Sequence, residues 1–335
     1  MNYSSLSDLG QSMMLRRQSS ELTTTLVKLT TELTTREVQD VGKKVRGNFG
    51  VISGLESSLL KLDGFSLGRS NIGQQVSNLQ TTLGAMEEVI SNYGTELAAA
   101  TGLEQPEVLE AHLSGASGRL SEVISRLNVQ VSGEYLFSGS ATGQKPLISG
   151  DEMLAQMSNL AAMSTGVSDF VMQVDAWFDD LGGGFETLAY GGGSQARSNI
   201  SISEHQEIDL PLKADNQNFR AMLKGLAVSA VISQGDIAAT SQEKRDVLSS
   251  VAQNLISAEL SLIEMQRDTG QVEALLERAD VAAVAEKSVL EMARSEILSI
   301  DPYETASALE AVQFQIETLY VLTARTSQLR LSDYL

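Results

Sequence analysis

Long heptad repeats constrain this chain more than any other feature of its sequence. Apolar residues alternate in spacing between four and three over residues 72–97, and again over residues 248–283. This spacing places the side chains on one stripe of a helix, which a partner helix must cover. At about 1.5 Å per residue, the second run alone would span roughly 50 Å. The sequence therefore predicts the long paired helices of a rod, with these stripes as its intramolecular core. The stripe positions are Ile72, Val76, Leu79, Leu83, Met86, Ile90, Tyr93 and Leu97 in the first run, and Leu248, Val251, Leu255, Ala258, Leu262, Met265, Thr269, Val272, Leu276, Ala279 and Ala283 in the second.

A further apolar stripe runs near each end of the chain, outside the rod. Two such helices would form a thin hairpin, which buries too little surface to be stable alone. We therefore expect neighbouring molecules to complete these stripes, which indicates assembly rather than catalysis. Residues 1–48 carry a net charge of +2 and residues 301–335 a net charge of −3, which weakly favours pairing of the two ends. The predicted assembly residues are Leu15, Leu22, Leu26, Leu29 and Leu33 near the N-terminus, and Leu309, Val312, Ile316, Leu319, Thr323 and Thr326 near the C-terminus.

The composition excludes several classes of function. The net charge of −19 argues against nucleic acid and anionic membranes as partners, because both are bound through Lys and Arg. The chain has no cysteine, which excludes disulfides, cysteine metal sites and a cysteine nucleophile. The first 20 residues lack the apolar core of a cleaved secretory signal, and residues 225–232 are far too short to span a membrane.

The order of the remaining segments predicts a mainly α chain with a small α+β insert between two rod halves. A short helix at residues 52–62 precedes the first long run, with Gly64 and Gly68 separating the two. Prolines open further helices at about 106–130 and from Pro302, where Asp301 is the expected N-cap. Alternating residues at 198–203 and 207–212 predict an antiparallel sheet, flanked by helices at about 151–164, 167–180 and 216–234. The predicted domains are residues 1–47 plus 300–335 for assembly, 48–133 plus 235–299 for the rod, and 134–234 for the outer insert.

No group of residues predicts a reactive centre, so we expect no catalytic, cofactor-binding or metal site and no enzyme activity. His112 and His205 lack spaced ligand partners. Asp175, Asp179 and Asp180 could line one helical face as a cation site, but a solvated face is the stronger interpretation. Residues 139–145 lack the spacing of a phosphate loop and lead into a proline.

Three segments carry a family resemblance. Residues 133–140, with the sequence GEYLFSGS, follow a predicted helix and resemble a turn typical of the flagellar hook-associated protein 3 family, which are hook–filament junction proteins related to flagellin. Residues 218–227, NFRAMLKGLA, are similar to the helix with which that family re-enters its rod, and residues 329–335, LRLSDYL, resemble its closing segment. The family's C-terminal helix is also resembled, at Ala306, Leu309, Gln313, Ala324 and Arg325. One departure is residues 33–40, LTTREVQD, which lack the family's Ser-Gly-rich turn.

The resemblance implies a flagellin-like rod and a non-enzymatic structural subunit of the bacterial flagellum. Such a protein would leave the cell through the flagellar type III channel and form a ring of its own copies at the hook–filament junction. Its other partners would be a second hook-associated protein on the hook side, flagellin on the filament side, and an export chaperone that binds the C-terminal helix. The sequence leaves two alternatives open, a minor flagellin that polymerises along the filament and a soluble coiled-coil scaffold.

Overall fold

The computed structural model describes residues 3–103, 105–235 and 237–332, and its contacts divide the chain into two compact units. Unit 1 comprises residues 1–62 and 284–335, and unit 2 comprises residues 63–283. Two long helices, α3 (Gly50–Thr101) and α9 (Ser241–Leu298), contribute to both units. The division into three domains expected from the sequence stays a prediction.

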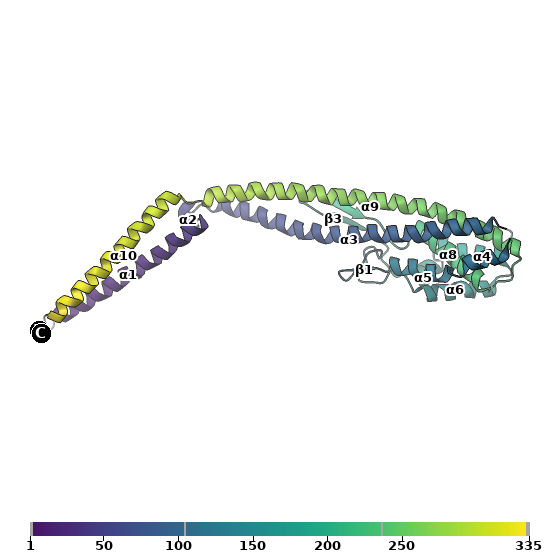
Figure 1. The fold of residues 1–335 in the computed structure, drawn as a ribbon, viewed down its shortest axis with the longest axis horizontal. Coiled ribbons are helices and arrows are strands. Elements are labelled where there is room, and N and C mark those ends of the chain that lie inside the picture. Colours follow the sequence, from purple (N-terminus) through teal and green to yellow (C-terminus); the bar gives the residue numbers. More distant parts are fainter. Residues whose placement is uncertain (1–2, 104, 236, 333–335) are drawn as a thin grey trace. The chain divides into compact units, whose positions relative to one another are not determined.

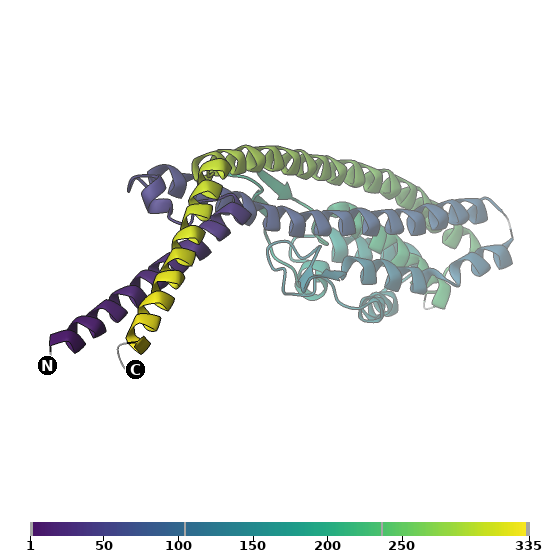
Figure 2. The same cartoon turned by 60° about the vertical axis from the view of Figure 1, so that its left-hand side comes forward.

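Unit 1 is built around two long terminal helices, α1 (Tyr3–Thr35) and α10 (Pro302–Ser332). They lie side by side and run in opposite directions (Figures 1 and 2). The predicted start of α10 is confirmed, because the Asp301 carboxylate accepts the backbone N–H groups of Tyr303 and Glu304 at 2.9 and 3.3 Å. Such a cap satisfies N–H groups that have no partner within the helix. The short helix α2 (Val41–Lys44) and the nearby ends of α3 and α9 complete the unit.

In unit 2 the predicted seam between α3 and α9 is confirmed. All eight stripe positions from residue 72 to residue 97 are buried, and so are the stripe positions of α9 from residue 248 to 269. The helices α4 (Pro106–Leu113), α5 (Ala116–Leu127) and α8 (Gln217–Gln234) share this core, and the ring of Phe137 packs edge-on against Phe219. The rod core is therefore intramolecular, as the heptad spacing predicts.

The outer part of unit 2 contains the expected mixture of short helices and strands. Its helices are α6 (Gly150–Met163), α7 (Val167–Asp179) and the short π-helical turn η1 (Phe185–Ala189). The predicted antiparallel sheet is formed by β3 (Arg197–Ser201) and β4 (Glu207–Leu210), with Ile200 opposite Ile208. A second, two-residue pairing joins β1 (Gln130–Val131) to β2 (Glu134–Tyr135).

Two helix boundaries differ from the prediction. Gly64 and Gly68 do not interrupt a helix, because α3 runs through both of them. A glycine costs about 1 kcal/mol relative to alanine within a helix but keeps its backbone N–H, so a long paired helix can tolerate two. The helix expected over 106–130 is instead two, α4 and α5, with Ser114 ending the first and Gly115 preceding the second. The apolar stripe of Leu109, Leu113, Ala116 and Leu120 continues across this break and therefore conceals it in the sequence.

Candidate assembly interface

The predicted terminal stripes lie within the α1–α10 pair. On α10, Val312 and Leu319 are only 9% and 7% exposed, while Leu309 and Ile316 are half-buried. The five leucines of the α1 stripe are all half-buried. Thr323 is exposed, and its hydroxyl donates to the Leu319 carbonyl at 2.7 Å. The side chain of Thr326 lies outside the described residues. The two stripes thus cover each other only in part, as two isolated helices must.

Sequence reasoning missed a second apolar face on the outside of this pair. On α10, Tyr303, Phe314 and Val321 are 83%, 69% and 54% exposed. They are spaced by eleven and seven residues, which at 3.6 residues per turn places them on one line, opposite the buried stripe. On α1, Met13 and Val27 are exposed in the same way. The spacing was visible in the sequence, but the aromatic residues stand too far apart to form a continuous heptad.

The segment that departs from the family's turn pattern fixes how α1 and α10 enter the pair. Arg36 adopts a left-handed backbone with φ of +60° and ends α1 in the place where glycine is usual. The chain then pairs with the end of α9: Val38 N–H donates to the Leu298 carbonyl at 2.9 Å, and Ile300 N–H donates to the Arg36 carbonyl at 3.2 Å. The ammonium group of Lys44 donates to the Ser299 carbonyl at 2.8 Å. A short antiparallel bridge therefore replaces the glycine-rich turn and ties both terminal helices at one end.

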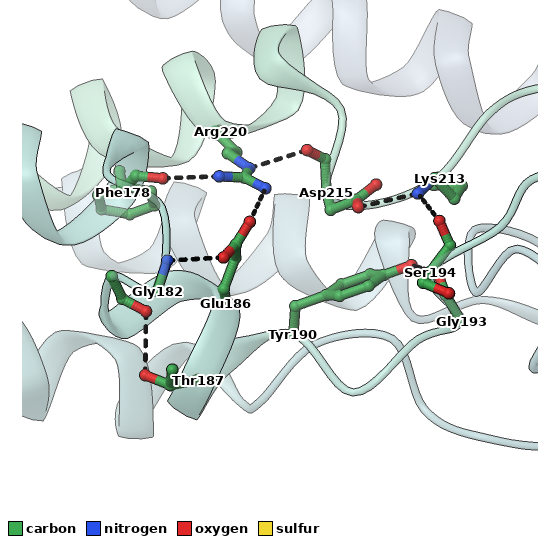
Figure 3. A network of polar contacts seen from close by, with 11 residues as sticks. Phe178, Gly182, Glu186, Thr187, Tyr190, Gly193, Ser194, Lys213, Asp215 and Arg220 are labelled. Carbon is green, nitrogen blue, oxygen red and sulfur yellow. Dashed lines mark hydrogen bonds and ion pairs between the residues drawn. The ribbon is translucent and has the colours of Figure 1, made fainter.

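In unit 2, a cluster of polar contacts surrounds Arg220 on α8 (Figure 3). Its guanidinium donates to the carbonyls of Asp215 and Phe178 at 2.8 and 3.0 Å and lies 3.7 Å from the Glu186 carboxylate, which in turn accepts Gly182 N–H at 2.8 Å. These contacts link the loop after α7 to the start of α8. The polar groups of this cluster bond to one another, so we assign the cluster a structural role within the outer insert.

Two of the three aspartates considered as a cation site, Asp175 and Asp179, form ion pairs with a lysine. Asp175 and Asp179 of α7 lie 2.8 and 2.6 Å from the Lys224 ammonium of α8. Burial lowers the pKa of Lys224, but the two carboxylates outweigh that effect and raise it. In the described part of the chain, no group of three or more His, Cys, Asp or Glu side chains is arranged to hold a metal ion. Within the same residues, no helix is long and apolar enough to cross a bilayer.

No family model matches the sequence, and no curated protein matches it significantly. Among solved structures, the chain is similar to a proposed flagellar hook-associated protein from Vibrio parahaemolyticus, with a TM-score of 0.51 and 12% sequence identity over 72% of this chain and 94% of that one. It is also similar to FlgL from Bacillus cereus, with a TM-score of 0.50 and 12% identity over 71% of this chain and 96% of that one. FlgL is hook-associated protein 3, the protein type that the sequence resembles. The chain therefore shares the fold that the resemblance implies, a mainly helical rod with a small α+β insert.

Proposed function

We propose that this protein is a non-enzymatic structural subunit of the bacterial flagellum that joins the hook-associated ring to the flagellin filament. The observation that carries the proposal is the fold that the chain shares with two flagellar hook-associated proteins. The match covers nearly the full length of both proteins. The apolar face left on the outside of the α1–α10 pair supports it, since large exposed apolar patches mark interaction sites. The site in this proposal is an interface, formed by residues 1–47 and 300–335.

In this proposal the protein leaves the cell through the flagellar type III channel and acts outside the cell. Copies of the chain contact one another through their terminal helices and form a ring. A second hook-associated protein borders the ring on the hook side, and flagellin borders it on the filament side. An export chaperone that covers the C-terminal helix before export would keep its apolar residues from aggregating.

Deletion of the gene tests the junction role. We expect cells to retain hooks and to shed flagellin as monomers, because the filament would have no base on which to grow. Immunogold labelling should place the protein at the filament base. Labelling along the whole shaft would instead identify a minor flagellin, and normal filaments in the deletion strain would favour a soluble scaffold.

Single charges in the terminal stripes test the interface. Leu319→Asp buries a carboxylate in the α1–α10 pair and Leu26→Asp half-buries one, and either change destabilises the pairing of the two helices. We expect either variant to be absent from flagella and to lose part of its helical circular dichroism signal, while the thermal unfolding of the rod is retained. Normal filaments assembled from either variant would contradict the interface.

A further inference from the structure

A buried arginine interrupts the apolar seam between α3 and α9. Arg69 occupies a seam position, three residues before Ile72 and seven before Val76, yet only 2% of its side chain is exposed. A charge in such a place destabilises the pairing of two helices unless other groups satisfy it. The partners of Arg69 therefore decide whether the helices stay paired at this end of the seam.

Two elements supply those partners. Nε of Arg69 donates to Oδ1 of Asp280 on α9 at 2.5 Å, and a terminal nitrogen of its guanidinium donates to the backbone carbonyl of Ile202 at 2.8 Å. Asp280 is half exposed, whereas Ile202, which directly follows β3, is 1% exposed. The β3–β4 hairpin thus covers the arginine on the side that Asp280 leaves open to water.

A second contact holds the other end of the hairpin. Gln75, also on α3 and almost completely buried, accepts a hydrogen bond from the Arg197 guanidinium at 2.6 Å and donates to Glu134 at 3.0 Å. Figures 1 and 2 both draw β3 alongside the paired helices. The hairpin is therefore fastened to α3 at its base, through Gln75, and at its tip, through Arg69.

We propose that the β3–β4 hairpin is a strap over Arg69 whose release separates α3 from α9 over residues 63–71 and 276–283. With the hairpin in place, the Arg69 guanidinium has hydrogen-bond acceptors and is shielded from water. Without it, water must enter the seam to solvate the freed donor. The apolar packing that resists the opening is narrow: Leu276 and Ala279 on α9 are buried, but Leu67 and Val281 point largely into solvent. The strap makes the pairing of α3 with α9 depend on the outer insert. This role of the hairpin is independent of the proposed flagellar function.

Hydrogen–deuterium exchange of the full chain tests the strap. Ile202→Gly removes the buried side chain that seats the tip and leaves Arg69 intact. We expect residues 63–71 and 276–283 to exchange faster by about tenfold or more, because loss of a large buried side chain frees the hairpin. Ser201→Gly, which changes an exposed neighbour on the same strand, should leave exchange in both helical segments at the wild-type rate.

A double variant separates the strap from general destabilisation. Adding Arg69→Met to Ile202→Gly makes the seam apolar, so the helices no longer need the hairpin. Exchange in both helical segments should return to within about threefold of wild type, while residues 197–210 stay fast. Unchanged helical exchange in Ile202→Gly would overturn the proposal. A failure of Arg69→Met to restore slow exchange would also overturn it.

Discussion

At the scale of single residues, Arg36 lies in the segment where the sequence lacks the Ser-Gly-rich turn of the family that it resembles. A left-handed backbone suits glycine and strains a residue with a side chain, and here an exposed arginine takes that conformation at the end of α1. The antiparallel bridge to residues 298–300 holds the strained residue in place. The sequence alone could not reveal this, because the bridge joins segments about 260 residues apart.

Replacement of Arg36 by glycine should therefore stabilise unit 1. We expect Arg36→Gly to raise its free energy of unfolding by about 0.5–1 kcal/mol, because the strain at positive φ disappears. Thermal unfolding followed by circular dichroism measures the change. Arg16→Gly, the same substitution within α1, is the control and should lose about 1 kcal/mol instead. Equal destabilisation by both variants would show that Arg36 is not strained.

A single carboxylate should make the start of α6 sensitive to acid. Ser149 donates its backbone N–H and its hydroxyl to the Glu152 carboxylate, both at 2.8 Å, and these bonds hold the pKa of Glu152 below its ordinary value. The stabilisation is complete above the unfolded pKa of about 4.3 and is lost as pH falls through the lower folded pKa. Titration followed by NMR should show this low midpoint. In Ser149→Ala the midpoint should rise but stay below that of a free glutamate, because the backbone bond remains.

At the scale of elements, the heptad periodicity predicted the long helices with repeating apolar positions and missed single residues that interrupt the repeat. Heptad spacing located the α3–α9 seam because burial on one side of a helix demands it. It could not reveal Arg69, since a charged residue in a seam position looks like a break in the pattern. The outer faces of α1 and α10 escaped for a related reason: Phe314 and Val321 follow the helical period, but too few apolar residues accompany them to form a stripe.

The two faces of α10 should respond differently to mutation. Phe314 and Val321 point outward, so Phe314→Ser with Val321→Ser should leave the helix content of the isolated protein unchanged. The proposed function predicts that this variant nevertheless fails to enter flagella, because the apolar contact with the next copy is gone. Leu319→Asp, on the inner face, should impair both helix content and assembly. Full incorporation of the outward double variant would exclude this face from the interface.

At the scale of the whole molecule, the two units differ in how completely they bury their apolar side chains. Unit 2 buries large side chains completely, among them Phe137, Phe178 and Phe219, around helices from both halves of the chain. In unit 1, the α1–α10 pair buries only a narrow stripe, and most of its apolar residues are half-buried or exposed. A thin pair of helices is stabilised by few contacts per residue, so its opening costs far less than unfolding of unit 2. The sequence predicted this contrast from the position of the stripes.

This contrast predicts that assembly, not folding, immobilises the terminal helices. In the isolated monomer we expect the amides of residues 10–35 and 302–325 to exchange hydrogen rapidly, while those of the α3–α9 seam from Val76 to Leu97 exchange slowly. In purified flagella the same terminal amides should become protected, because neighbouring copies cover the outward faces of both helices. Exchange measured by mass spectrometry on both samples compares the two states, with the seam as an internal control. Strong terminal protection in the monomer would mean that the α1–α10 pair is stable by itself, and it would favour a soluble scaffold over a subunit completed by its neighbours.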